Sequence, residues 1–172
     1  MATTPAAPTF AFTVAESKAA VDACLQVRIE VFIDEQGFSM DDEIDEHDTA
    51  GDHISFLVSD TSLAPPKPVG TVRLVPAKGK LTRLAVLAAY RKFGLGRQLV
   101  QQLEAYVRAH PDALRSQVKV GADGREYVQI KIHSQIPVIP FYAKLGYKPE
   151  GEQFPEDGAP HQKMVQDFLV EQ

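Results

Sequence analysis

The chain of 172 residues has the length and composition of one globular domain, with 44% hydrophobic and 24% charged residues. Its net charge of −5 argues against general nucleic-acid binding, and its single cysteine, Cys24, excludes an internal disulfide and a cysteine-based metal site. No apolar run is long enough to span a membrane, and residues 1–9 lack the charged start and apolar middle of a signal peptide. We expect a flexible tail over 1–9, one domain over 10–172 and a cytoplasmic location, with a nuclear pool left open.

The first half of the chain predicts a strand, a helix and three more strands. Phe10 to Val14 alternates apolar and small residues, as a strand does. Ser17 is a plausible N-cap for a helix that runs to about Phe32, because apolar residues then recur at helical spacing. The acidic segment 41–48 reads as a loop. Strands are expected over 53–59, 69–75 and 81–87, separated by turns at 63–68 and 78–80.

The second half of the chain begins with a strongly patterned helix. Leu95, Leu99, Leu103 and Val107 lie four residues apart, and Pro111 ends this helix. The segment 112–126 is polar, contains a turn at 121–124 and suggests no function. A strand over 127–133, a short helix over 137–145 with Gly146 as its C-cap, a strand from Tyr147 and a last strand over 161–168 follow. This order indicates a mixed α/β domain built on one sheet.

The turn between the strand at 81–87 and the next helix is rich in glycine and basic residues. Gly94 and Gly96 have no Cβ, and free backbone N–H groups at a helix start attract phosphate. Leu99 stands where the dinucleotide motif requires its third glycine, and the P-loop pattern is also absent. Taken alone, the sequence Arg-x-x-Gly-x-Gly, from Arg91 to Gly96, therefore fits either a site for another phosphate-bearing cofactor or a plain strand-to-helix turn.

This turn resembles the acyl-CoA pyrophosphate loop of the GNAT N-acetyltransferase superfamily. Four other segments, in the same order as in that family, resemble its motifs and in particular those of the ElaA-like and YjcF-like branch. They are Arg28 to Gln36, Arg83 to Val86, Pro140 to Tyr147 and Phe154 to Met164. The chain departs from the pattern at Ser134-Gln135, where many members have Asn, and at Ala159, where the branch has Ile.

The resemblance implies a single α/β (α+β) domain, with a central mixed, mostly antiparallel sheet of about six to seven strands flanked by helices. It also implies acetyl-CoA as co-substrate and no metal. The residues it assigns to the cofactor are Leu84, Ala85, Val86, Arg91, Lys92, Phe93, Gly94, Leu95, Gly96 and Arg97. The backbone N–H of Val86 would face the thioester carbonyl as an oxyanion donor.

The transfer also needs an acid for the leaving thiolate and a route for the proton of the amine. Tyr142 is the expected general acid, because a phenol donates a proton yet is neutral at pH 7. Glu35, His133 and His161 are alternative general bases, each with an ordinary structural reading that competes with the catalytic one. The residues expected to contact the acceptor are Phe32, Glu35, Gln36 and His161.

The function expected from the resemblance is acetyl transfer to a primary amine of a small molecule, such as an amino sugar, a polyamine or an amino-acid-like amine. A protein or peptide acetyltransferase and a non-catalytic acyl-CoA-binding sensor are the alternatives. The acidic segment 41–48 is either a solvated face or a feature that attracts a cationic amine. Neither a nucleic-acid nor a membrane partner is expected, and a homodimer is left open.

Overall fold

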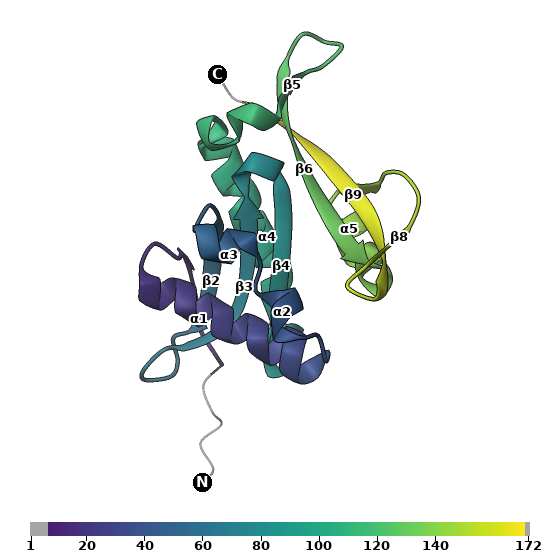
Figure 1. Cartoon of the computed structure of the whole chain (residues 1–172). Coiled ribbons are helices and arrows are strands. Elements are labelled where there is room, and N and C mark those ends of the chain that lie inside the picture. Colours follow the sequence, from purple (N-terminus) through teal and green to yellow (C-terminus); the bar gives the residue numbers. More distant parts are fainter. Residues whose placement is uncertain (1–6, 171–172) are drawn as a thin grey trace.

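The computed structural model describes residues 7–170, and a nine-stranded sheet runs through this part of the chain (Figure 1). The main path of the sheet has the order β1-β2-β3-β4-β6-β9-β7, while β5 pairs with β6 and β8 pairs with β9. All recorded pairs are antiparallel except β4 with β6. The strands are β1 (Phe10–Val14), β2 (Ile54–Asp60), β3 (Lys67–Val75), β4 (Lys80–Val86), β5 (Val118–Val120), β6 (Glu126–Gln135), β7 (Lys148–Pro149), β8 (Phe154–Glu156) and β9 (Ala159–Leu169).

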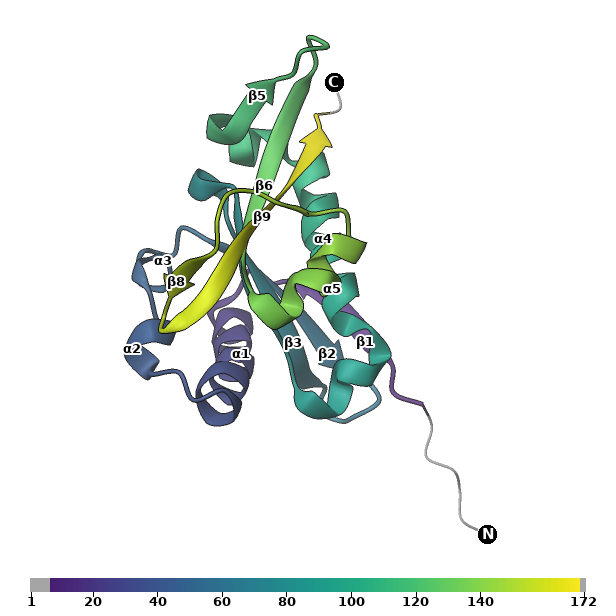
Figure 2. The same ribbon diagram turned by 90° about the vertical axis from the view of Figure 1, so that its right-hand side faces the viewer.

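Helices cover both faces of the sheet (Figure 2). One face carries α1 (Lys18–Arg28), α2 (Met40–Glu43) and α3 (Glu46–Ala50), and the other carries α4 (Leu95–Ala109) and α5 (Ile139–Lys144). A π-helical segment, Ile29–Glu35, continues α1 without a break. Short 3-10 segments lie at Pro76–Lys78, Ala88–Phe93, Pro111–Gln117 and Ile136–Val138. The expected mixed α/β fold is confirmed, with two more strands than expected.

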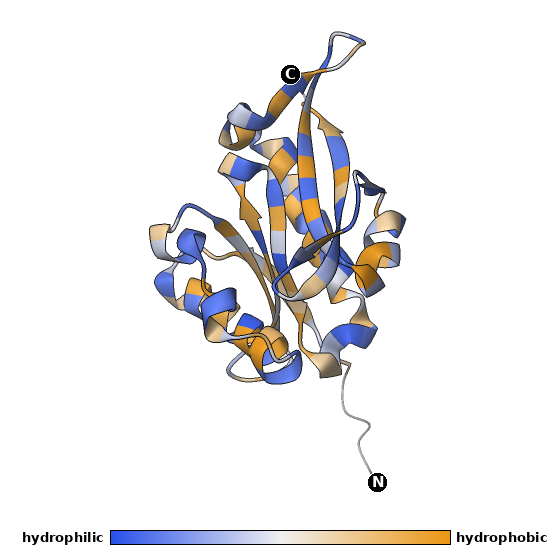
Figure 3. Ribbon diagram, turned by 45° about the vertical axis from the view of Figure 1, so that its right-hand side comes forward, coloured by the Kyte–Doolittle hydropathy of each residue, from blue (hydrophilic) through white to orange (hydrophobic). Residues whose placement is uncertain are grey.

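The core lies mainly between the sheet and α4. The four leucine and valine side chains of the predicted stripe are buried, as is Val100 beside them. On β6, alternate residues Val128, Ile130 and Ile132 face this core, so hydrophobic and hydrophilic bands alternate along the strand (Figure 3). Burial of each such side chain contributes about 1.5–3 kcal/mol, which accounts for the fixed positions of α4 and β6.

The strands β4 and β6 touch at one point and then separate. Their parallel pairing has a single register pair, Lys80 with Lys131, and the N–H of Lys131 donates to the carbonyl of Gly79 at 2.9 Å. Beyond that point β6 pairs only with β9 on its other edge, while β4 pairs only with β3. The divergence is visible between the two strands in Figure 1. It leaves facing backbone edges of both strands without a partner strand.

A bulge in β4 lies beside this opening. Thr71 and Arg73 of β3 are two residues apart, but their partners Ala85 and Thr82 on β4 are three apart. The extra residue is accommodated by Arg83, whose φ is +54°, a left-handed value that is rare for a residue with a side chain. The bulge changes the direction of β4 next to the gap.

The acidic segment expected as a loop forms the short helices α2 and α3. Ser39 caps α2, and Asp45 caps α3 together with the carboxylate of Asp48. The buried Arg28 donates to Glu43 at 2.5 Å and to Asp48 at 2.7 Å. The prediction of a loop is therefore wrong for most of this segment, and two of its carboxylates pair with a buried arginine of α1 rather than with solvent.

Two more arginines complete this cluster. Arg73 is 1% exposed, donates to both carboxylate oxygens of Asp45 and lies 3.0 Å from Asp48. Arg83 donates to the carbonyl of Glu43 at 3.0 Å, and its Nε lies 3.2 Å from the Glu43 carboxylate. Burial alone would raise the pKa of Asp48, but hydrogen bonds from Arg28 and from the Asp45 amide lower it well below its usual range.

Other predictions are confirmed or revised in detail. Gly146 follows α5 with a φ of +97°, which confirms the predicted helix end. The polar segment after α4 contains a 3-10 segment and β5, which pairs with β6 and was not expected. Residues 1–6 of the expected tail lie outside the described part of the chain. At the end of this tail, the carbonyl of Thr9 accepts a hydrogen bond from the N–H of Thr61 at 2.8 Å, so Thr9 is tied to the residue that follows β2.

We expect the substitution Arg28→Ala to lower the free energy of unfolding by about 3 kcal/mol, because it leaves the buried carboxylate of Glu43 and the largely buried one of Asp48 without their main partner. Urea denaturation followed by circular dichroism measures this change. The matched control is Lys18→Ala, since Lys18 is 88% exposed and pairs with Asp22 across one helix turn. Equal small effects of the two substitutions would contradict the role given to the buried cluster.

Candidate active site

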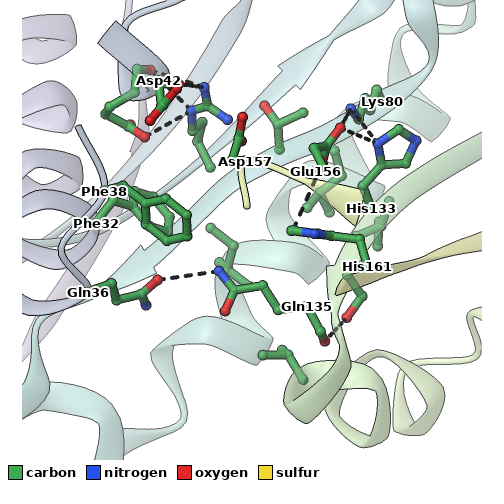
Figure 4. A pocket seen from close by; sticks show the side chains of 18 of the residues that line it. Phe32, Gln36, Phe38, Asp42, Lys80, His133, Gln135, Glu156, Asp157 and His161 are labelled. Atoms are coloured by element: carbon green, nitrogen blue, oxygen red, sulfur yellow. Dashed lines mark hydrogen bonds and ion pairs between the residues drawn. The ribbon is translucent and has the colours of Figure 1, made fainter. Parts of the chain in front are cut away.

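A cavity of about 180 Å³ lies where β4 and β6 separate, on the sheet face that carries α1 and α2. Its walls come from the end of the π-helical segment, α2, β4, β6, the 3-10 segment before α5, α5 itself and the hairpin of β8 and β9 (Figure 4). The lining residues are Phe32, Gln36, Phe38, Asp42, Glu43, Lys80, Leu81, Thr82, Arg83, Leu84, Ile132, His133, Ser134, Gln135, Val138, Tyr142, Glu156, Asp157 and His161. Segments far apart in the sequence therefore share one pocket.

One wall of this pocket carries a cluster of four titratable side chains. His133 Nδ1 lies 2.9 Å from Glu156 Oε1 and 3.0 Å from Lys80 Nζ. His161 Nδ1 donates to the carbonyl of Ala159 at 2.9 Å, and its Nε2 lies 3.9 Å from Glu156 Oε2. Figure 4 shows the ring of His161 extending into the pocket below Glu156. A carboxylate, an amine and two imidazoles thus meet on one side of the cavity.

The surroundings set the charge of these groups. Burial lowers the pKa of His133 more than the hydrogen bond with Glu156 raises it. Burial also lowers the pKa of Lys80, although the charge of Glu156 opposes this. Burial alone would raise the pKa of Glu156, but the hydrogen bond with His133 and the charge of Lys80 lower it. At neutral pH the wall therefore presents an ionised carboxylate beside a neutral imidazole.

Tyr142 reaches the pocket from the opposite face of the sheet. It belongs to α5, which lies on the side of α4, and its side chain lines the cavity at the gap between the strands. The ring packs against Phe141 and Tyr147, with centroids 5.0 and 6.0 Å apart. Burial raises the pKa of Tyr142 far above its usual value. The phenol is therefore protonated at neutral and mildly alkaline pH.

The unpaired edge of β4 supplies backbone donors and acceptors next to Tyr142. The N–H of Leu87 donates to Val69 of β3 at 2.9 Å. Because successive residues of a strand direct their amides to opposite edges, the N–H and carbonyl of Val86 point toward the gap. Leu84 lines the pocket, while Ala85 is buried and pairs with β3. The expected position of Val86 as an oxyanion donor is compatible with this direction.

The glycine-rich turn leads directly into α4, as expected. Gly94 is the N-cap residue, with a φ of +70°, and no side chain caps the helix. A Cβ on Gly94 would meet nothing within 4 Å, and one on Gly96 would meet only the ring of Phe141 and Val86, at 3.6 Å or more. Free N–H groups and open space at a helix start fit a pyrophosphate. Lys92, Phe93, Leu95 and Arg97 lie on the same turn, where Leu95 is fully buried and packs the helix onto the core.

Arg91 and Glu35 form an ion pair with one another. Arg91 donates to both carboxylate oxygens of Glu35 at 2.6 Å and to the carbonyl of Val86 at 3.0 Å. The hydrogen bond from Arg91 lowers the pKa of Glu35, although the slight burial of the carboxylate opposes this. Glu35 does not line the pocket. Glu35 is a poor candidate for a base, because its carboxylate ties the π-helical segment to the end of β4.

The remaining acceptor residues lie in the pocket with several that the sequence did not single out. Phe32 and Gln36 line it, and Gln36 Oε1 accepts from Gln135 Nε2 at 3.3 Å. Phe38 and Lys80 were missed, because neither belongs to a segment with a motif. Glu156 was part of a quoted motif but received no role. Of the acidic segment 41–48, only Asp42 and Glu43 line the pocket. Because Glu43 is paired with arginines, the structure does not support attraction of an amine by the whole segment.

Comparisons with known proteins agree with this geometry. A family model described as the acetyltransferase (GNAT) domain matches residues 21–168. A Bacillus subtilis protein whose name assigns it to the acetyltransferases is 38% identical over 143 residues, which are 81% of this chain and 84% of that protein. The N-acetyltransferase YjcF of Bacillus subtilis is 32% identical over 157 residues, covering 90% of this chain and 97% of the relative.

A solved structure shows the same arrangement of elements. The crystal structure of Escherichia coli ElaA has a TM-score of 0.70, with 92% of this chain and 99% of that chain covered. Its sequence identity is 24%, so this likeness shows the fold alone. Within residues 7–170, no group of three or more His, Cys, Asp or Glu side chains is placed to hold a metal ion. In the same range, none of the helices combines the length and the apolar character needed to span a bilayer.

We expect Gly96→Glu to weaken binding of acetyl-CoA at least 100-fold, because it adds bulk and negative charge where the helix start faces the pyrophosphate. Isothermal titration calorimetry measures the affinity. The matched control is Ala105→Glu, which adds the same charge at an exposed position of the same helix. Unchanged affinity in the Gly96 variant would contradict the placement of the pyrophosphate at this turn.

Proposed function

The chain belongs to the GNAT acetyltransferase family, in its ElaA and YjcF type, and the enzymes of this family use acetyl-CoA as co-substrate. We propose that this protein acetylates a primary amine of a small molecule. The acceptor attacks the thioester directly while both substrates are bound. The observation that carries this proposal is the pocket at the gap between β4 and β6, which joins a neutral tyrosine to a wall with imidazole and carboxylate groups.

The two sides of the gap are suited to different substrates. The turn before α4 and the edge of β4 suit the cofactor, while the cavity lined by Phe32, Gln36 and His161 suits the acceptor. The N–H of Val86, directed toward the gap, is suited to stabilise the oxyanion of the tetrahedral intermediate. As the C–S bond breaks, Tyr142 gives its proton to the leaving thiolate.

The shape of the pocket favours a small acceptor over a protein segment. Side chains from α2, β4, β6 and the β8–β9 hairpin surround a cavity of about 180 Å³. An extended peptide would need a groove that continues past these walls. The lining combines two aromatic rings, Phe32 and Phe38, with two carboxylates, Asp42 and Asp157. This combination suits an amine with both apolar and cationic parts.

The test of this function is thiol release from acetyl-CoA with a panel of amines at mildly alkaline pH. The panel contains amino sugars, polyamines, amino acids, arylalkylamines and a lysine peptide. Turnover with a small amine, and slower turnover with the peptide, is the expected result. Turnover with the peptide alone would support a protein acetyltransferase, and acetyl-CoA binding without any turnover would support a sensor.

We expect Tyr142→Phe to lower kcat by about 100-fold or more while the Kd for acetyl-CoA is unchanged, because only the proton donor is lost. Steady-state kinetics and calorimetry measure the two quantities. Tyr127→Phe is the matched control, since its hydroxyl donates to Asp123 on the exposed hairpin, far from the pocket lining. A wild-type kcat in the Tyr142 variant would remove the general-acid role.

A further inference from the structure

His161 has one ring nitrogen that is fixed and one that is free. The side chain is 8% exposed, and its Nδ1 donates to the carbonyl of Ala159, which in the neutral ring leaves the lone pair on Nε2. The nearest acceptor or donor recorded for Nε2 is Glu156 Oε2 at 3.9 Å, beyond hydrogen-bond range. The ring extends into the pocket (Figure 4), so this lone pair is available to a bound amine.

His133 does not offer the same opportunity at its Nδ1. That nitrogen has two partners, Glu156 and Lys80, within 3.0 Å. Nδ1 of His133 can donate a hydrogen bond to Glu156 or accept one from Lys80, but it cannot do both at once. In either case this nitrogen is occupied by a neighbouring side chain. The pair Phe154 and His133 packs edge to face at 4.8 Å, which further fixes this ring. His133 therefore holds Glu156 in place.

Glu156 joins the two histidines. One carboxylate oxygen lies at His133 and the other faces His161 Nε2. The side chain of Glu156 is 36% exposed. Phe154, two residues earlier on β8, is the strand partner of His161 on β9. A carboxylate at this distance stabilises an imidazolium through its charge, while the bond from Nδ1 to Ala159 orients the ring.

We propose that His161 accepts the proton of the acceptor amine and that Glu156 is the positioning residue that stabilises the charge formed there. This inference rests on the proposed acetyl transfer. The sequence left Glu35, His133 and His161 open as bases and gave Glu156 no role. The geometry favours His161, because Glu35 is bonded to Arg91 outside the pocket and Nδ1 of His133 already has Glu156 and Lys80 as partners.

The protons balance as follows. The bound ammonium gives one proton to His161 Nε2, and the neutral nitrogen then attacks the thioester carbonyl and forms the C–N bond. The C–S bond breaks, and sulfur takes the proton of Tyr142. The second nitrogen proton restores Tyr142, and His161 releases its proton to solvent. One amide, one thiol and one proton result from the ammonium and the thioester.

The titratable and charged groups that line the pocket together with His161 come from five elements. Glu156 and the following Asp157 approach from β8 and its turn, and Lys80 and Arg83 approach from β4. Asp42 and Glu43 line the α2 side, His133 lies on β6 and Tyr142 on α5. Arg83 and Glu43 neutralise one another, and Lys80 lies closer to His133 than to Glu156. Among the described residues, Glu156 is the carboxylate with a recorded contact to His161, so its removal takes away the nearest negative charge.

The decisive measurement is an NMR titration of the histidine ring signals in the free protein, with His161 assigned by the variant His161→Asn. In Glu156→Gln we expect the midpoint of this ring signal to move to lower pH than in the unsubstituted protein, since the carboxylate charge beside the ring is gone. Glu156→Asp retains a carboxylate and should recover most of the shift. Glu150→Gln is the control, because that exposed carboxylate pairs with Lys163 outside the pocket.

The kinetic counterpart is the pH profile of kcat/KM with the best amine of the panel. The acidic limb should move to lower pH by the same amount in Glu156→Gln, with kcat reduced about tenfold or more, and His161→Asn should lose about 100-fold. Thermal denaturation establishes that each variant is folded.

Three outcomes separate the proposals. An unchanged His161 midpoint in folded Glu156→Gln, or an even loss of rate at every pH, overturns the role of Glu156. Near wild-type turnover in His161→Asn overturns the base. A shifted midpoint without turnover on any amine supports the coupling of the two side chains and contradicts the proposed function.

Discussion

The divergence of β4 and β6 is the constraint on which the site depends. Two parallel strands held at one register pair, Lys80 with Lys131, leave backbone groups on both inner edges unpaired. Such groups are costly unless something bonds to them, so the gap favours a ligand with polar groups along its length. The same separation lets Tyr142 of α5 reach a pocket on the opposite face of the sheet.

The second wall of the pocket is held by charge rather than by apolar packing. Arg73 and Arg83 attach α2 and α3 to the sheet, and Arg28 attaches them to α1, through Glu43, Asp45 and Asp48. Because the arginines are largely buried, these ion pairs fix the direction of the chain more than they add to stability. The bulge at Arg83 belongs both to this cluster and to the edge of the gap, so it couples the acceptor wall to the cofactor strand.

Burial and neighbouring charges together set the protonation states of the groups in the pocket. It raises the pKa of Tyr142, which is then a proton donor, and lowers that of His133, which is then neutral. Glu156 has a lowered pKa because His133 and Lys80 outweigh its burial, so it is an anion that can stabilise a charged imidazole. These states follow from neighbours that come from β4, β6 and β8, which meet only in the folded chain.

Local patterns in the sequence were enough to determine the main elements, the helix start at Gly94 and the family. Apolar spacing defines α4 and β6, and glycine at a helix start has a direct local meaning. The pairing of Glu35 with Arg91, the short helices of the acidic segment and the contact of Glu156 with His133 were decided by tertiary structure. The physical reason is that a charged side chain acts through the partner it meets, and these partners lie 15 to 56 residues away along the chain.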